Sequence, residues 1–261
     1  MCGYQRDGKK QVLIVGGTGY LGKGLVKASL AQGHSTYEQG AHLVSGSFVY
    51  HQSLVDAVKL VDVVISAISG VHLRSHHILL QLKLVDVIKE AGNIKRFLPS
   101  EFGTDPARME NAMEPGRVTF DDKMAVRKAI QEAGIPFTYV SANCFAGYFV
   151  GGLCQPGGIL PSRDHVVLFG DGNQKFVEIW EKLIGKQLQK SSISKEEFLT
   201  NMKTQTYAVQ VGSTHCYHVF YDGCHANFEI GDGAEEASQL YPEIKYTTVH
   251  EYMKDPNHAL S

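Results

Sequence analysis

The sequence predicts an α/β fold with a doubly wound parallel sheet, followed by a smaller C-terminal lobe. In the first 150 residues, short apolar runs alternate with helical patterns, which is typical of a parallel sheet with helices on both faces. The run Val61–Ile68 is almost continuously apolar, as expected for a strand that is covered on both sides. After about Gly151 the pattern becomes irregular. We therefore expect one domain over residues 1–150 and a smaller lobe over residues 151–261.

The individual elements follow from these patterns in order. The predicted strands are Gln11–Gly16, His34–Tyr37, Ala41–Val44, Val61–Ile68, Lys95–Pro99 and Phe137–Asn143. The predicted helices are Tyr20–Gln32, Arg74–Ala91, Val118–Ala133, Glu178–Lys186 and Ser194–Lys203. Gly92 and Gly134 close two of these helices, and Ser194 with Glu197 has the spacing of a capping box.

The composition excludes several classes of protein. The chain has 261 residues, of which 43% are apolar and 20% charged, so it can fold around a core. Lys and Arg number 25 against 27 Asp and Glu, which argues against nucleic-acid binding. The polar start, Met1–Lys10, does not resemble a signal peptide, and no apolar run approaches the ~18 residues of a membrane span. Five scattered cysteines favour a cytoplasmic protein with free thiols.

The strongest local signal is the segment VLIVGGTGYLG, residues 12–22, which joins the first apolar run to the first helical pattern. In a Rossmann-like fold, Gly16 would permit the tight turn, Gly19 would let the backbone approach a pyrophosphate, and Gly22 would let the helix pack closely. The helix N-terminus would offer N–H groups to the phosphates. The predicted cofactor-binding residues are Gly16, Gly17, Thr18, Gly19, Tyr20, Leu21 and Gly22. The alternative is a glycine-rich turn without a ligand.

Lys123 is the catalytic candidate. Short-chain dehydrogenases that reduce ketones carry Tyr-x-x-x-Lys, but the residue four before Lys123 is Thr119, which argues against a tyrosine acid. The Lys123 amine can carry a proton if burial or a neighbouring cation lowers its pKa. Arg127 lies one turn further on the same helix face and is either that cation or a cofactor ligand. The alternative is a solvated lysine on a charged helix.

Three longer blocks resemble a known family. They are RFLPSEFG at residues 96–103, KMAVRKAI at 123–130 and GIPFTYVSANCFAGYF at 134–149. These blocks are similar to the plant phenylpropanoid reductases, an NmrA-like group of atypical short-chain dehydrogenases that includes the isoflavone reductases and the phenylcoumaran benzylic ether reductases. Within this group, SANCF at 141–145 and GGLCQP at 151–156 look most like the pinoresinol–lariciresinol reductases.

The resemblance implies an NADPH-dependent, homodimeric enzyme that opens a benzylic ether of a furofuran or furan lignan. It would convert pinoresinol to lariciresinol, and the further step to secoisolariciresinol stays open. The family has a base for the para-phenol at the position of Lys123. The bond between the benzylic carbon and the ether oxygen breaks to give a quinone methide, and hydride from NADPH adds to the benzylic carbon. Arg127 matches a cofactor-binding arginine, and Phe149 a residue of the substrate pocket. His215 matches a substrate-binding histidine, with His218 as the close alternative.

Other functions stay open beside this one. Related NmrA-type regulators bind NAD(P) without turnover, and an inactive truncated variant is the third hypothesis. We expect no metal site at Cys216, Cys224 and His225, because their spacing with His215 matches no zinc pattern. We expect Cys144 and Cys154 to be packing residues, because no histidine stands near them in the sequence to activate them.

The sequence departs from the family at two places. Only residues 38–40 separate the expected second and third strands, where the family has an arginine for the cofactor 2′-phosphate and a crossover helix. Parallel neighbours need a crossover of about a dozen residues, so one strand is lost or the pair is not parallel. Glu38 is not predicted to bind the cofactor ribose, because the segment that begins with it resembles the family residues that precede the third strand. The second segment that the family has and this sequence lacks would follow Lys175. We expect the absence of the two segments to expose part of the hydrophobic core.

Overall fold

The computed structural model describes residues 10–36, 46–69, 77–143, 146–155, 160–225, 228–231 and 233–255. The chain divides into two compact units. The first comprises residues 1–111 and 117–142, and the second comprises residues 112–116 and 143–261. The short segment 112–116 therefore belongs to the second unit although the first unit surrounds it in the sequence.

The first unit contains a four-stranded parallel sheet in the order β2-β1-β3-β4. The strands are β1 (Gln11–Val15), β2 (Ser35–Thr36), β3 (Val63–Ser66) and β4 (Arg96–Leu98). Strand β1 pairs in parallel with β2 on one side and with β3 on the other. The order of the strands thus reverses between β1 and β3, and α/β sheets bind ligands beyond the carboxyl ends of their strands at such a switch point.

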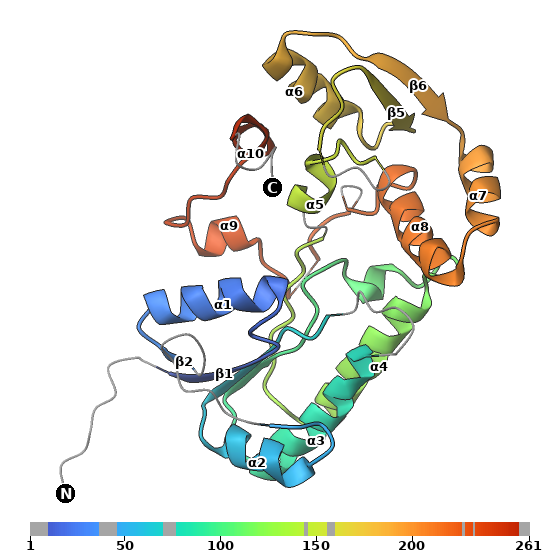
Figure 1. The fold of residues 1–261 in the computed structure, drawn as a ribbon. Helices are drawn as coiled ribbons and strands as arrows, with labels where there is room; N and C mark the ends of the chain where they lie inside the picture. Colours follow the sequence, from blue (N-terminus) through green and yellow to red (C-terminus); the bar gives the residue numbers. More distant parts are fainter. Residues whose placement is uncertain are drawn as a thin grey trace, which may run out of the picture. The chain divides into compact units, whose positions relative to one another are not determined.

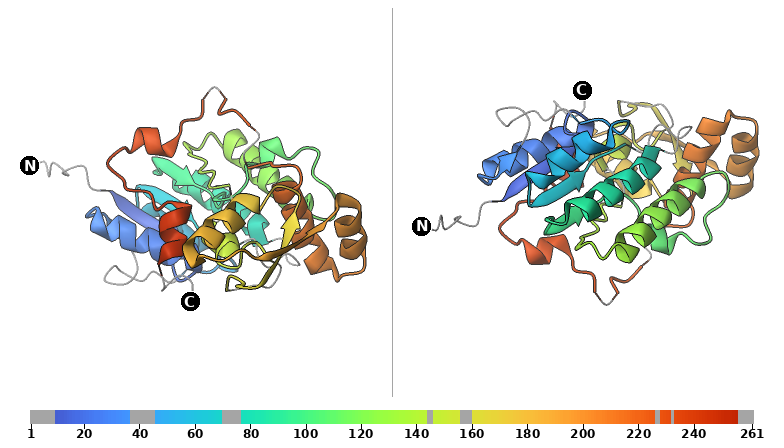
Figure 2. Two further views of the ribbon diagram at one scale, coloured as in Figure 1. Left: turned by 90° about the horizontal axis from the view of Figure 1, so that it is seen from above. Right: turned by 90° about the horizontal axis from the view of Figure 1, so that it is seen from below.

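Helices cover both faces of this sheet (Figure 1). The helices of the first unit are α1 (Tyr20–Ala31), α2 (His51–Lys59), α3 (Leu80–Ala91) and α4 (Val118–Glu132), with two short turns, η1 (His77–Leu79) and η2 (Pro106–Arg108). Because side chains alternate along a strand, Val12 and Ile14 of β1 pack with α1, while Leu13 and Val15 contact the larger cluster on the other face. That face carries α2, α3 and α4 side by side (Figure 2, right). The predicted doubly wound α/β class is confirmed.

One prediction for the first unit is wrong, and one of its helices was not predicted. Phe137–Asn143 is not a strand: Phe137 makes one isolated bridge to Phe97 of β4. Beyond it the chain makes side-chain contacts instead of a ladder, such as the bond from the Ser141 hydroxyl to the Gly103 carbonyl. Helix α2 was not predicted, although its buried Leu54, Val55 and Val58 have helical spacing. The predicted strand Ala41–Val44 and the start of the helix predicted from Arg74 lie outside the described residues.

The second unit contains a parallel strand pair that the sequence analysis missed. Strands β5 (His165–Phe169) and β6 (Gln189–Ile193) are joined by α6 (Gln174–Ile184). The prediction failed because β6, QKSSI, is exposed over four of its five residues and carries no apolar run. Helix α6 runs unbroken across the second place where family residues are missing, and it buries Val177 and Trp180 there. At this junction the expected exposure of core is not found.

The remaining helices of the second unit are α5 (Ala146–Val150), α7 (Lys195–Lys203), α8 (Tyr207–Phe220), α9 (Ala237–Leu240) and α10 (Val249–Lys254). The Ser194 hydroxyl accepts a hydrogen bond from the Glu197 N–H at 3.1 Å, which confirms the N-cap half of the predicted capping box at α7; the return bond from the Glu197 side chain is not formed. Cys154 is buried in a cluster with Phe169 and Phe220, so its prediction as a packing residue is confirmed. Cys144 lies outside the described residues.

Three features are absent from the part of the chain that the structure describes. None of its helices is long and apolar enough to cross a membrane. Its cysteines Cys154, Cys216 and Cys224 form no disulfide. Its His, Cys, Asp and Glu side chains make no group of three that could hold a metal ion.

Candidate active site

The glycine-rich loop, residues 16–22, lies at the carboxyl end of β1 and leads into α1. Gly16 has a φ of +88°, a conformation that L side chains rarely adopt, and a Cβ there would lie 2.8 Å from the carbonyl oxygen of Ala67. A Cβ on Gly22 would overlap the carbonyl oxygen of Gly16. The loop therefore requires glycine at both positions, as the sequence analysis predicted.

The loop also fits the pyrophosphate of a dinucleotide. Gly19 is the N-cap of α1, and it has no side chain to accept from the N–H groups of the first helical turn. Such a helix end presents donors to a phosphate. Of the seven predicted cofactor residues, Gly16, Thr18, Gly19 and Tyr20 are exposed, Leu21 is half-buried, and Gly17 and Gly22 are buried. The outer side of the loop is thus open to a ligand, while its inner side packs on the sheet.

Lys123 is buried on α4, with only 9% of its surface exposed. Its Nζ donates a hydrogen bond to the backbone carbonyl of Glu101 at 2.8 Å. Burial lowers the pKa of Lys123, and the Arg127 charge adds to this effect; the Glu101 and Asp105 charges oppose it without cancelling it. The alternative of a solvated surface lysine is therefore wrong. A buried amine with a lowered pKa holds more of its neutral form near neutral pH and can accept a proton.

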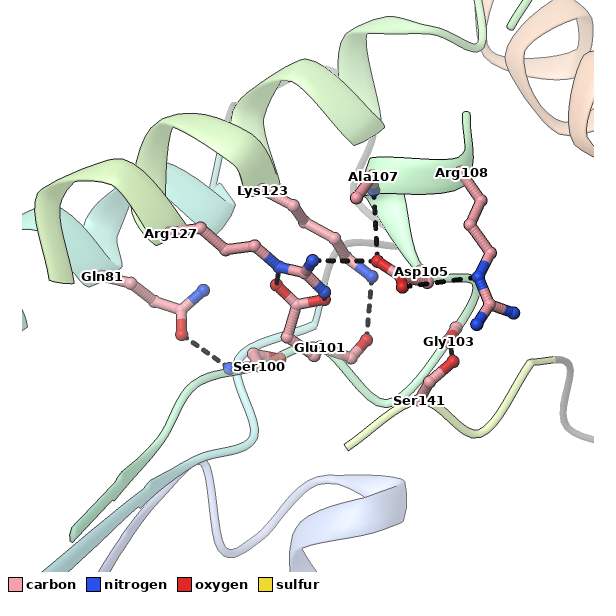
Figure 3. Close-up of polar contacts among 10 residues, drawn as sticks. All are labelled: Gln81, Ser100, Glu101, Gly103, Asp105, Ala107, Arg108, Lys123, Arg127 and Ser141. Atoms are coloured by element: carbon pink, nitrogen blue, oxygen red, sulfur yellow. Dashed lines mark hydrogen bonds and ion pairs between the residues drawn. The ribbon is translucent and has the colours of Figure 1, made fainter. Parts of the chain in front are cut away.

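A cluster of three charged side chains stands next to Lys123 (Figure 3). Arg127 binds the carboxylate of Glu101 through two parallel bonds, from Nε at 3.0 Å and from Nη2 at 2.8 Å. Its Nη1 lies 2.8 Å from Oδ1 of Asp105. All three guanidinium nitrogens thus contact carboxylates, and the predicted role of Arg127 as a cofactor ligand stays a prediction. We name Glu101, Arg127 and Asp105 the carboxylate–arginine cluster.

Glu101 and Asp105 were not singled out in the sequence analysis as site residues. Both lie in the loop that follows β4, at the carboxyl edge of the sheet. The signal that locates Glu101 is the RFLPSEFG block, which points above only to the family; Asp105 lies two residues beyond this block. Their chemical partners could not be predicted, because Arg127 is 26 positions away from Glu101 in the sequence.

Two buried hydroxyl groups accompany the cluster. Among the described atoms, the hydroxyls of Thr119 and Tyr139 have no hydrogen-bond partner. Thr119 stands one helical turn before Lys123, where ketone reductases carry their tyrosine. Burial raises the pKa of Tyr139 to about 12, so this phenol keeps its proton near neutral pH. The Arg127 guanidinium lies over its ring at 4.3 Å, a cation–π contact.

The predicted substrate residues His215 and Phe149 belong to the second unit. His215 lies within α8, not in a surface loop, and its Nε2 donates to the Gly116 carbonyl at 3.0 Å. His218 uses both ring nitrogens inside the same unit: Nε2 accepts from the Met113 N–H at 3.0 Å, and Nδ1 donates to Asp222 at 2.9 Å. These bonds give His218 a structural role, which leaves His215 as the better candidate for a ligand contact.

Phe149 lies in α5 beside an aromatic cluster. Its ring meets Phe220 edge to face, with the ring centroids 6.0 Å apart. Phe220 in turn stacks on Phe169, with the ring centroids 5.4 Å apart.

Cys216 lies on α8 between His215 and His218, and burial raises the pKa of its thiol to about 11. This thiol is protonated near neutral pH, so it is not a nucleophile.

The first unit thus joins a glycine loop at a topological switch point to a buried lysine at the same edge of a parallel sheet. This combination defines a Rossmann-like dinucleotide-binding protein of the short-chain dehydrogenase type without its tyrosine acid. The chain belongs to the NmrA-like family, whose model matches residues 8–165, and within it to the branch of the pinoresinol–lariciresinol reductases.

Comparisons with individual proteins agree. The chain is 61% identical to the bifunctional pinoresinol-lariciresinol reductase 2 of Linum usitatissimum, with 94% of this chain and 93% of the relative aligned. It is 58% identical to the bifunctional pinoresinol-lariciresinol reductase of Forsythia intermedia, over 95% of this chain and 99% of the relative. A solved structure of AtPrR2 with NADP+ and (+)pinoresinol matches with a TM-score of 0.89 at 44% identity, over 94% of this chain and 98% of that one.

These alignments bear on the two missing segments. The alignment with the Linum usitatissimum relative spans 307 positions, whereas this chain has 261 residues. It therefore sets residues of the relative against gaps in this chain. This confirms that the chain lacks internal residues that its relatives have.

Proposed function

We propose that the protein is an NADPH-dependent reductase that opens a benzylic ether of pinoresinol to give lariciresinol, and then the remaining furan ring to give secoisolariciresinol. The observation that carries this proposal is the buried amine of Lys123 at the carboxyl edge of the sheet that bears the glycine loop. The reductase names of relatives up to 61% identical support the same substrate class.

Lys123 performs the proton step in this reaction. In its neutral form, Nζ accepts the proton of the para-phenol of the substrate. The phenolate electrons then expel the benzylic ether oxygen, which takes a proton from water and becomes an alcohol, while the aryl ring becomes a quinone methide. NADPH, when bound, would supply the hydride that reduces the benzylic carbon. The regenerated phenolate then recovers its proton from the Lys123 ammonium. No carbonyl is reduced, so Thr119 in place of the tyrosine acid is compatible with this chemistry.

The residues that would hold NADPH are those of the glycine loop, residues 16–22. Its open outer side and the uncapped first turn of α1 suit the pyrophosphate. Arg127 stays a candidate for a further cofactor contact through its family position. On the substrate side, His215 and Phe149 are proposed to contact the lignan.

We expect the chain to prefer NADPH over NADH by less than about tenfold. The arginine that reads the 2′-phosphate in the family is absent from this sequence, and a charged contact to phosphate contributes most of such a preference. Fluorescence titration of both cofactors gives the two dissociation constants. A strong preference for NADPH would contradict the expectation and show that another basic residue reads the phosphate.

His215→Ala should raise KM for pinoresinol about tenfold, the effect of one lost hydrogen bond to a buried ligand, with kcat changed little. Steady-state kinetics at saturating NADPH separates the two constants. His250→Ala is the matched control, since His250 is an exposed histidine of the same unit. If both variants keep the parent KM, His215 does not bind substrate.

The proposed function is tested by incubating the protein with racemic pinoresinol and NADPH, followed by chiral product analysis. Formation of lariciresinol supports the function, and the enantiomer consumed defines the stereochemistry. Binding of NADPH without any lignan turnover would refute it and favour a non-catalytic NmrA-type regulator. A cooperative thermal transition that rises with NADPH would oppose the third hypothesis, an unstable truncated variant.

We also propose that the protein is a cytoplasmic homodimer. The odd number and scattered positions of the five cysteines favour a reducing compartment, and the dimer rests on family resemblance. Light scattering during size-exclusion chromatography gives the mass directly, and a monomeric mass would refute the dimer.

A further inference from the structure

We propose that the carboxylate–arginine cluster positions Lys123, by holding the backbone carbonyl of Glu101 against the Lys123 amine. Glu101, Arg127 and Asp105 would be positioning residues for the reaction, none of them touching the substrate. This inference rests on the proposed function of Lys123 as the base.

The cluster itself is buried and tightly connected. The exposed fractions of the Glu101 and Arg127 side chains are 5% and 11%. The two parallel bonds between them fix both planar groups in one relative orientation. The third nitrogen of Arg127 reaches Asp105, and the Asp105 carboxylate also accepts from the Ala107 N–H at 3.1 Å. Arg127 therefore ties the loop after β4 to helix α4 at two points of that loop.

Further bonds fix the start of the same loop. The buried Gln81 accepts from the Ser100 N–H at 2.7 Å (Figure 3). The Ser100 hydroxyl donates to the Ile68 carbonyl at 2.6 Å. Phe102, the residue after Glu101, has a φ of +32°, in the region that non-glycine residues avoid. Such a backbone conformation persists only where surrounding contacts enforce it. The carbonyl of Glu101 thus has one defined position.

The side chain and the main chain of Glu101 have different partners, which explains why the cluster would affect the reaction. Arg127 occupies both oxygens of the Glu101 carboxylate, so Lys123 contacts the neutral carbonyl instead. A direct ion pair with the carboxylate would favour the charged ammonium and raise its pKa. A carbonyl directs the amine and leaves its charge to be decided mainly by burial. The arrangement orients Lys123 without stabilising its protonated form as strongly as an ion pair would.

Helix α4 carries both basic residues, and their spacing places them on the same face of the helix. Lys123 and Arg127 are four residues apart, so they lie one above the other on one helix face. That face meets the loop after β4, where Lys123 contacts the Glu101 main chain and Arg127 its side chain. A shift of the loop that moved the carbonyl would therefore also break the bidentate pair.

The first test is Glu101→Gln, which removes one charge and keeps the shape of the side chain. We expect kcat for pinoresinol to fall about tenfold, because a misdirected base loses rate. The dissociation constant for NADPH should stay unchanged. Because the Glu101 charge raises the pKa of Lys123, its removal should move the rising limb of the pH–rate profile to lower pH. A purely structural role would lower the rate at every pH without moving the limb.

Arg127→Lys is the second variant and covers the case in which Glu101→Gln does not fold. It keeps the positive charge but cannot form two parallel bonds. We expect a similar fall in kcat and a shift of the rising limb to higher pH, because a Glu101 oxygen freed from Arg127 can pair with the Lys123 amine and raise its pKa. Asp121→Asn is the matched control: Asp121 is a carboxylate of the same helix, 60% exposed, and pairs with Arg117 on the surface. Its kinetics should equal those of the parent.

A measurement without substrate separates this inference from the proposed function. Competitive acetylation with acetic anhydride at a series of pH values, read by mass spectrometry, reports the titration and reactivity of Lys123 in the folded protein. We expect Glu101→Gln to shift this titration to lower pH and Asp121→Asn to leave it unchanged. The inference is overturned if Glu101→Gln or Arg127→Lys keeps the parent kcat, or if the titration of Lys123 does not respond to Glu101→Gln. If the parent protein does not turn over pinoresinol, only the proposed function of the protein is refuted.

Discussion

Lys123→Met will lower turnover of pinoresinol about 1000-fold, the middle of the range for loss of a positioned acid–base group. Methionine keeps most of the length of the side chain and removes the amine, so NADPH binding at the glycine loop should stay within about twofold of the parent. Single-turnover kinetics and a fluorescence titration with NADPH measure the two effects. Normal turnover in this variant would remove Lys123 from the mechanism.

The same variant carries a pH-dependent change in stability. Burial lowers the pKa of Lys123 from its ordinary value of 10.5, so the folded protein holds the ammonium at a cost whenever it is charged. The cost is fully present below the folded-state pKa and disappears as the pH rises through that pKa towards 10.5. The lost bond to the Glu101 carbonyl destabilises the variant equally at every pH. We therefore expect the Tm of Lys123→Met, relative to the parent, to be highest below the folded-state pKa of Lys123 and to fall as the pH rises through that pKa towards 10.5.

Gly22→Ala will weaken NADPH binding by at least about tenfold and lower the Tm. The new Cβ would overlap the Gly16 carbonyl oxygen, and Gly16 itself packs closely on the backbone carbonyl of Ala67. Both neighbours are backbone, so the loop must open, and forced contacts of this kind typically destabilise a protein by 1–3 kcal/mol. Fluorescence titration and thermal unfolding measure the two consequences.

Gly24→Ala is the matched control for this change. Gly24 lies in the same helix, and a Cβ there meets nothing within 4 Å. Alanine in a helix interior stabilises by roughly 0.5–1 kcal/mol relative to glycine, so the Tm should rise and NADPH affinity should stay. If Gly22→Ala binds NADPH as tightly as Gly24→Ala, the glycine loop is not the cofactor site.

Local sequence pattern predicted much of the first unit. Strand β1, helix α1 and helix α4 lie within a residue or two of their predicted bounds, because each combines a clear apolar period with a glycine at one end. Helix α2 was not predicted; it begins after Tyr50, whose side chain makes no capping bond. In the second unit, the residues of β6 are mostly exposed and polar, so its pairing with β5 was not predicted.

The candidate site was predictable in part for the same reason. Lys123 and the glycine loop carry signals within a dozen residues of sequence. The environment of Lys123 does not, because its carbonyl partner at Glu101 and the charges around it come from the loop after β4. Burial of the amine, which decides its pKa, depends on the packing of α4 against that loop.

The sequence by itself determined the order of the elements in the first unit, the glycine turn and the identity of the lysine, since these depend on neighbours along the chain. Tertiary structure alone decided that Arg127 neutralises Glu101 and that Lys123 contacts a carbonyl instead of a carboxylate. It also brought segment 112–116 into the second unit, where Met113 bonds His218 across 105 positions. Contacts between distant residues depend on how the elements pack together, which no local pattern records.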